Sequence, residues 1–521
     1  MRNRALRILY VFILFFSLIF MPLELFGYDS EEKGVHDTAT KEAWTKAIGE
    51  GDFLQNLGLT KDDVLYQGKG AKDWVALGSR FEDGETFIGI VRTVNHFYDP
   101  VKKIGLNDPC GFPNILNIPI SPSPSWGLGY VPLLNKWDIK NAREYEYIAL
   151  TGKEFDGSTV SDAQDDKGRK KYFAHMFRAV GQVMHLVEDS AVPEHVRNDG
   201  HALPGDRSLY EAYAATNKDS LNYDGYPLVS FPAYYCYFDT GPGTCGDVAD
   251  GMGLTEFTNR NFVSQSTNFD DRGLCRLAAG IYSQPQPEFS HDEEEIVPLP
   301  GGGTKNVWVH YVGNTVRDFL TGEAIENPYL SAYSWWNFET EKLGKLSYSL
   351  SKKCFKATAD FVIPRAMGYS AGLLDYFFRG KIEMAPSEDG SGYVIENKTE
   401  EDMDGTFELY YDATDNQRKQ CWSGSFALGA LSSGNNKSDT ITFTPPDDAK
   451  EPDKYILVFQ GRLGNEDNAV VGSLQNLKSC GAILILPVQG LIEMLDRATF
   501  TQKLTGTFKY LKAGGGGGYA I

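Results

Sequence analysis

The stretch HLVEDSAVPEH, from His185 to His195, carries residue types and spacings that suit a metal site. His185 and Asp189 are four residues apart, so a helix places them on one face, one turn apart, where both can reach one ion. Pro193 is expected to end that helix and to turn His195 away from the first ion. A His-x-x-x-Asp pair by itself is more often a hydrogen-bonded pair, because a metal site needs several ligands.

Further candidate ligands lie in the first 211 residues, which hold six of the eight histidines. The fragment VNHFYDP places one of them among aromatic residues, GSRFEDGE supplies Glu82 and Asp83 shortly before it, and SLYEAY is expected to form a short helix. Outside the opening stretch, the candidate metal ligands are His36, Asp83, His96, His201 and Glu211. His175 is instead expected on a helix surface. Mixed nitrogen and oxygen ligands of this kind suit Zn²⁺, with Mn²⁺ or Fe²⁺ as alternatives.

The helix that must carry His185 and Asp189 is predicted over residues 170–190, where apolar residues recur every three or four positions. Its buried stripe is expected to consist of Phe173, Phe177, Val180, Met184 and Val187. The same spacing predicts further helices over residues 42–49, 306–322 and 342–380. Residues 28–384 are therefore expected to form a mainly helical domain with irregular insertions.

Beyond residue 380 the sequence changes to short runs rich in Thr, Tyr, Phe and Val, separated by turn residues. Strands are expected over residues 392–400, 405–414, 421–431, 439–446 and 454–464. Their spacing predicts a small all-β sandwich at 385–478, to which we assign an accessory or adhesive role. Residues 479–521, which include five consecutive glycines, are expected to be a partly flexible tail. The predicted chain is thus multidomain, all-α and then all-β.

The N-terminus has the layout of a secretory signal peptide over residues 1–27. Three arginines precede an apolar stretch from Ile8 to about Leu23, and polar sequence follows. An uncleaved membrane anchor is the alternative. We expect a secreted, periplasmic or cell-surface protein. Of the seven cysteines, Cys236 and Cys245 flank a Gly-Pro-Gly turn and are the pair most suited to a local disulfide.

The combination of these motifs resembles the zinc-dependent bacterial phospholipase C enzymes and their relatives, the fungal single-strand nucleases. It rests on the spacing of His185, Asp189 and His195 with the intervening proline, and on NHFYDP at His96 and SLYEAY at Glu211. The match covers about residues 30 to 215 and, more weakly, the segment 363–380. The resemblance implies a helical domain that binds two or three zinc ions.

The resemblance also implies a role for each ligand. One zinc ion is held by Asp83, His96 and His185, and Asp189 bridges it to a second ion. His36 is a ligand of that second ion, and His195 and Glu211 are ligands of a more separate third ion.

Two positions depart from the family. Its mature chains begin with a metal-binding tryptophan, whereas this chain would begin near Tyr28 and has its next tryptophan at Trp44. The family also has a histidine four residues before the glutamate, where this chain has Arg207. His201 is the nearest substitute, and Asp199 and Asp206 are the alternatives.

Close-set metal ions suit phosphodiester hydrolysis, in which an activated water attacks phosphorus in line. Asp83 and Asp189 are the expected catalytic carboxylates, and Asp83 is placed to orient or deprotonate the water. Arg197 and Arg207 can bind phosphate oxygens through two parallel hydrogen bonds. A structural or solvated salt bridge is the alternative for each arginine.

The first hypothesis is therefore an exported zinc phosphodiesterase of phospholipase C type, acting on a phospholipid or membrane surface. The alternatives are a single-strand nuclease of the same fold and a secreted binding or adhesion protein whose metal site is structural or degenerate. With 50 basic and 70 acidic residues the net charge is −20, which argues against tight nonspecific binding to duplex DNA and favours the lipid enzyme. No stable protein partner is predicted.

Overall fold

The computed structural model describes residues 33–47, 52–83, 92–107, 120–130, 135–201, 208–269, 282–298, 302–334 and 348–477. The predicted signal peptide, the C-terminal tail and Arg207 lie outside these residues. The helices are α2 (Val35–Lys46), α3 (Asp52–Asn56), α4 (Ala71–Glu82), α6 (Ser123–Gly127), α7 (Ile139–Thr151), α8 (Asp166–Asp189), α9 (Pro193–Val196), α10 (Leu209–Asn217), α11 (Leu254–Asn261) and α13 (Lys352–Phe377). Short 3₁₀ turns are η1 (Ser161–Ala163), η2 (Lys218–Ser220), η3 (Tyr234–Tyr237) and η5 (Leu431–Ser433). The strands are β1 (Phe289–Pro298), β2 (Thr304–Arg317), β3 (Ala324–Ser334), β4 (Ile382–Pro386), β5 (Tyr393–Asn397), β6 (Met403–Asp412), β7 (Arg418–Leu428), β8 (Lys454–Leu463) and β9 (Glu466–Asn476).

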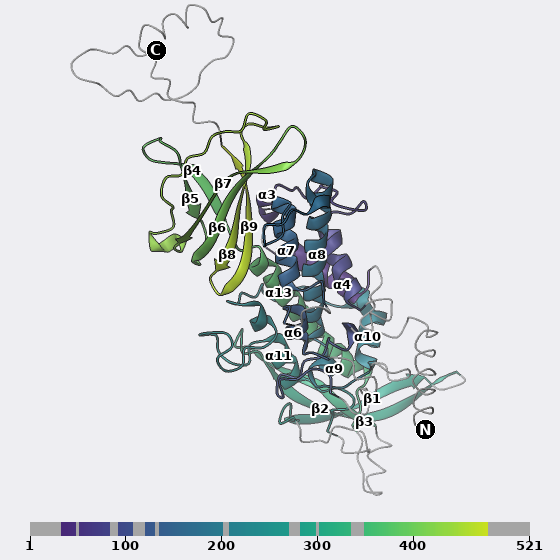
Figure 1. The fold of residues 1–521 in the computed structure, drawn as a ribbon. Coiled ribbons are helices and arrows are strands. Elements are labelled where there is room, and N and C mark those ends of the chain that lie inside the picture. Colours follow the sequence, from purple (N-terminus) through teal and green to yellow (C-terminus); the bar gives the residue numbers. More distant parts are fainter. Residues whose placement is uncertain are drawn as a thin grey trace, which may run out of the picture. The chain divides into compact units, whose positions relative to one another are not determined.

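Helix α8 is the centre of the helical region, and α4 and α7 pack along it (Figure 1). Its predicted stripe is confirmed, since all five residues of that stripe are buried. The Asp165 side chain caps the first turn by accepting a hydrogen bond from the Gly168 amide. Helix α13 and α2 also contact α8, so α8 is enclosed on several sides.

The end of α8 differs from the prediction. The helix stops at Asp189, before Pro193, and Pro193 is the first residue of the new short helix α9, which carries His195. Proline suits the first turn of a helix because the amide hydrogen it lacks has no partner there anyway. The predicted turn exists, but Pro193 starts a helix and does not end one.

The helix predicted over residues 306–322 is wrong, because most of it is strand β2. Strands β1, β2 and β3 form an antiparallel sheet in that order, inserted before α13. Apolar residues recur there at a spacing of two as well, at Val307, Val309 and Tyr311. β-branched and aromatic side chains favour a strand. The long antiparallel pairing of β2 with β1 and β3 then selects the strand over the helix.

The C-terminal part is confirmed as β-rich. It contains a two-stranded sheet, β4-β5, and a four-stranded antiparallel sheet in the order β7-β6-β8-β9, which share one hydrophobic core. The run 439–446 forms only an isolated bridge at Ile441, and strands β4 and β9 were not predicted. Along β6, Phe407 and Leu409 face that core, whereas Tyr410 belongs to the core of the helical region. The larger sheet is therefore covered on both faces.

The described residues, all between Lys33 and Leu477, belong to one compact unit, and the second unit, Lys478–Ile521, lies outside the described residues. Within the part of the chain that the structure describes, no helix is long and apolar enough to span a membrane. The predicted disulfide between Cys236 and Cys245 is confirmed.

Candidate metal centre

Separate helices bring the predicted ligands together around the C-terminal end of α8. Helix α8 itself carries His185 and Asp189, and Asp83 is the residue that caps the end of α4. The remaining ligands come from the start of α2 (His36), the segment after Arg92 (His96), α9 (His195), the following loop (His201) and the first turn of α10 (Glu211). All these side chains are buried except that of His201, which is partly buried.

The first ligand group consists of Asp83, His96, His185 and Asp189. The His185 Nε2 atom lies 3.4 Å from both Asp83 Oδ1 and His96 Nδ1, and 3.2 Å from Asp189 Oδ2. The His96 Nδ1 atom lies 2.8 Å from Asp189 Oδ2 and 3.6 Å from Asp83 Oδ1. Four ligands at zinc–nitrogen or zinc–oxygen distances of about 2.0–2.1 Å in a tetrahedron are separated by about 3.3 Å. The five separations, from 2.8 to 3.6 Å, are close to that value.

The hydrogen bonding of the two carboxylates in this group indicates whether a cation could bind between them. Among the described residues, neither oxygen of Asp83 nor Oδ2 of Asp189 accepts a hydrogen bond of regular geometry, although both side chains are buried; their nearest partners are the imidazoles of His96 and His185, the other ligands of the group. Buried carboxylate oxygens without donors are costly unless a cation compensates their charge. The neighbouring Glu82 is different, because it accepts hydrogen bonds from Arg92 and from Trp126 Nε1, the latter at 2.8 Å. Asp83 and not Glu82 is thus the carboxylate left for a metal ion.

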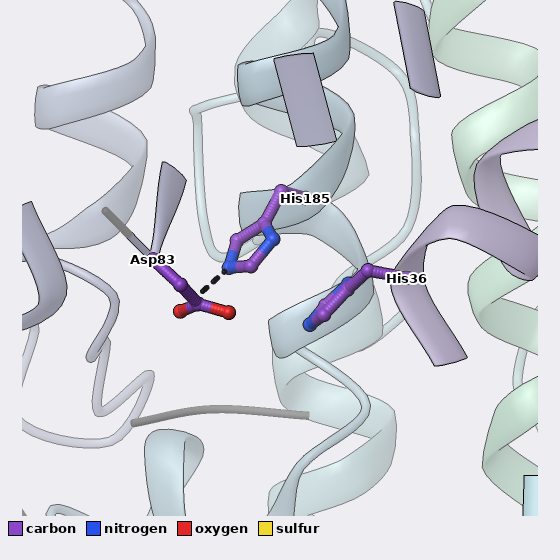
Figure 2. Close-up of side chains that lie close together, drawn as sticks. All are labelled: His36, Asp83 and His185. Carbon is purple, nitrogen blue, oxygen red and sulfur yellow. Dashed lines mark ion pairs between the residues drawn. The ribbon is translucent and has the colours of Figure 1, made fainter. Parts of the chain in front are cut away.

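His36 joins the first group from α2. Its Nε2 atom lies 3.4 Å from Asp189 Oδ1, the oxygen that faces away from the first group. Ligand atoms of His36, Asp83 and His185 also lie within 4.8 Å of one another, and Figure 2 shows the three side chains converging. Asp189 therefore has one oxygen toward the first group and the other toward His36, as a bridging carboxylate requires.

The second ligand group consists of His195, His201 and Glu211. The Nε2 atoms of the two histidines are 3.4 Å apart, and Glu211 approaches them at 3.6 Å and 3.2 Å. His201, the nearest histidine considered in place of Arg207, thus lies with His195 and Glu211. The alternative ligand Asp199 accepts a hydrogen bond from the Ser266 amide, and Asp206 lies outside the described residues.

Burial and mutual charge shift the pKa values of the ligands in the metal-free chain. Burial opposes the ionised form of Asp189, but His185, His195 and His96 outweigh it and hold the pKa of Asp189 well below its usual value. Burial lowers the pKa of His195 to about 4, so this imidazole is neutral at physiological pH. Burial opposes the charged form of His201 as well, yet Glu211 raises its pKa to about 10. Metal binding would therefore release a proton from His201.

Two of the residues considered in the sequence, His175 and Arg197, lie outside the ligand groups. His175 is half-buried among the rings of Trp137, Tyr145 and Tyr172. Arg197 is buried and donates hydrogen bonds to Thr267 and to the carbonyl oxygens of Asn259 and Gln284. Arg207 lies outside the described residues. Phosphate binding by the two arginines stays a prediction.

Two buried glutamates near the ligands were not predicted. Glu188 accepts a hydrogen bond of 2.7 Å from Nδ1 of His36. Burial and the nearby Asp199 raise the pKa of Glu194, which precedes His195, to about 8. Their only signal in the sequence is that each is adjacent to a predicted ligand, in the fragments VED and PEH.

Comparisons with known proteins add little. No family model and no curated protein matches this sequence. Among solved structures, the chain is similar to the alpha toxin from Clostridium absonum, at 13% identity and a TM-score of 0.29, over 87% of this chain and 100% of the toxin. It is also similar to the alpha-toxin of Clostridium perfringens from the avian strain SWCP, at 12% identity and a TM-score of 0.26, over 87% and 100% of the two chains. At these TM-scores we draw no conclusion from either similarity.

Proposed function

We propose that this protein is an exported zinc-dependent phosphodiester hydrolase of phospholipase C type. The proposal is carried by the first ligand group, in which five separations between ligand atoms, from 2.8 to 3.6 Å, are close to those expected around one tetrahedral ion. The second ligand group lies beside it and is linked to it through His195, whose Nδ1 is 3.5 Å from Asp189 Oδ1. Neighbouring sites of mixed nitrogen and oxygen ligands suit zinc and phosphate-ester hydrolysis.

The zinc ions, Asp83 and Asp189 would have different roles in the hydrolysis. When bound, zinc ions lower the pKa of a coordinated water and offset negative charge on phosphate oxygens. Asp83 would orient the attacking water or accept its proton, because among the described residues its oxygens face only the ligand imidazoles of His96 and His185 and accept no hydrogen bond of regular geometry. Through its two oxygens, Asp189 contacts the first group on one side and His36 and His195 on the other, and so positions all three relative to one another.

The phospholipid substrate and the export are further parts of the proposal. The net charge of −20 disfavours a polyanionic nucleic acid and supports the lipid over the single-strand nuclease alternative. The Cys236–Cys245 disulfide supports export, since such bonds persist in oxidising compartments.

Zinc analysis and two substrates test the proposal. We expect two or three zinc ions per purified chain, and hydrolysis of phosphatidylcholine vesicles with release of phosphocholine. His96→Gln should lower both the zinc content and the rate, whereas His175→Gln, a histidine outside the ligand groups, should change neither. Cleavage of single-stranded DNA without cleavage of phosphatidylcholine would show that the substrate is a nucleic acid and not a lipid. Zinc binding without either activity would favour the binding protein, and one zinc ion or none would refute the proposal.

A further inference from the structure

Three helices meet at the carboxylate of Glu188, next to the metal ligands but outside both ligand groups. Helix α8 supplies Glu188 itself, α2 supplies His36 and Thr40, and α13 supplies Ser370. The Oε2 atom of Glu188 lies 2.7 Å from His36 Nδ1. The Oε1 atom accepts hydrogen bonds from the hydroxyls of Thr40 at 2.9 Å and Ser370 at 3.5 Å. Both oxygens are therefore held by protein groups, and the side chain is 3% exposed.

This arrangement determines which nitrogen of His36 carries the ring hydrogen. An ionised carboxylate only accepts hydrogen bonds, so Nδ1 of His36 carries the hydrogen that points to Glu188. The lone pair of the neutral ring is then on Nε2, which faces Asp189 Oδ1 at 3.4 Å. A carboxylate behind a ligating histidine fixes the tautomer and the ring orientation in this way.

We propose that Glu188 is the positioning residue of a metal ion held by His36 and Asp189, separate from the ions of the two ligand groups. Glu188 does not ligate the ion itself, because its oxygens are engaged by His36, Thr40 and Ser370. This inference rests on the proposed zinc centre but needs neither a lipid nor a nucleic acid as substrate.

The test compares Glu188→Ala with Glu188→Gln. In Glu188→Ala, His36 loses its acceptor, and we expect the weakest zinc site to bind about 10–100-fold less tightly, so that one zinc ion per chain is lost on dialysis. Glu188→Gln keeps an oxygen for His36 and should retain most of that ion. Glu144→Gln, a glutamate on α7 away from the ligands, is the matched control and should keep the full zinc content.

Two further measurements distinguish a role of Glu188 in metal binding from a purely structural role. Thermal unfolding of the metal-free variants reports any purely structural role of Glu188, and the visible spectrum of cobalt-loaded protein reports the geometry of each site. Equal zinc content in Glu188→Ala and the unchanged chain would refute the positioning role, as would loss of all zinc sites together. Absence of zinc from the unchanged chain would instead refute the proposed function.

Discussion

At the scale of single residues, Asp189 connects every part of the candidate centre. Its Oδ2 atom faces His96 and His185, and its Oδ1 atom faces His36 at 3.4 Å and His195 at 3.5 Å. A single carboxylate therefore lies between the two ligand groups.

Asp189→Asn should remove hydrolysis and lower the zinc content. An amide has one oxygen and no negative charge, so it cannot serve ligands on both sides. We expect a loss of rate of more than about 100-fold, because even partners behind the ligands cost up to that factor. Phosphocholine release and zinc analysis measure the two effects, and circular dichroism should show unchanged helix content. Full activity would refute the bridging role.

His175 gives a pH dependence that is separate from the metal centre. Burial, Lys171 and Arg178 lower its pKa from 6.5 to about 4. The unfolded chain therefore binds more protons between these values, so this contribution to stability is fully present above pH 6.5 and is lost as the pH falls toward 4.

The pH dependence can be isolated with His175→Gln. Between about pH 7.5 and about pH 5, we expect the unchanged chain to lose up to about 2 kcal/mol more unfolding free energy than the variant. Urea unfolding of both proteins in a chelator measures this difference without metal binding. Equal losses would show that His175 titrates normally in the folded chain.

At the scale of elements, the crossing of α4 and α8 brings Asp83 toward His185. A methyl group added at Gly181 would lie 1.9 Å from the carbonyl oxygen of Val75, and one at Gly78 would lie 2.1 Å from that of Arg178. Only glycine allows the two backbones to approach this closely. The helices thus cross at two glycines, a few residues before the candidate metal ligands Asp83 and His185.

Gly181→Ala should push α4 away from α8. We expect a loss of about 1–3 kcal/mol in unfolding free energy from overpacking, and weaker zinc binding because Asp83 moves away from His185. Chemical denaturation and zinc competition with a chelator measure the two effects. Lys167→Ala, an exposed position on α8, is the control and should alter neither. If Gly181→Ala is less stable but binds zinc with unchanged affinity, the crossing of α4 and α8 does not position the metal ligands.

At the scale of the whole molecule, a buried charge network joins the helical region to the larger C-terminal sheet. Arg143 of α7 donates to both oxygens of Glu466 on β9, at 2.8 Å and 3.1 Å, and to the Phe377 carbonyl oxygen at the end of α13. Arg379 donates to the same glutamate at 2.7 Å. The sheet is therefore attached by charge as well as by its second apolar face.

Glu466→Gln should destabilise this attachment. The buried Arg143 and the partly buried Arg379 would lose their shared carboxylate, which costs about 3–5 kcal/mol for a buried ion pair. We expect a lower melting temperature and faster proteolysis after α13, with unchanged zinc content because the ligands lie in the helical region. Asp467→Asn, the exposed neighbour, is the control. Loss of zinc in Glu466→Gln would mean that the sheet supports the metal centre.

The sequence alone was sufficient for features with local causes. The buried stripe of α8, the strands from β5 to β8 and the Cys236–Cys245 pair follow from periodicity and turn residues. The eight candidate ligands were likewise named from residue type and from the spacing of a known motif set, and their role as ligands stays a prediction. The stripe, the strands and the disulfide each depend on neighbours within about one helix length of chain.

Tertiary structure alone decided the rest. Segment 306–322 satisfied both the helical and the strand period, and only pairing with β1 and β3 selected a strand. Asp83 differs from Glu82 because Arg92 and Trp126 engage the latter, and Glu188 lies behind His36 although 152 positions separate them. Such distinctions depend on which donors a buried carboxylate meets, and those donors come from parts of the chain that only folding brings together.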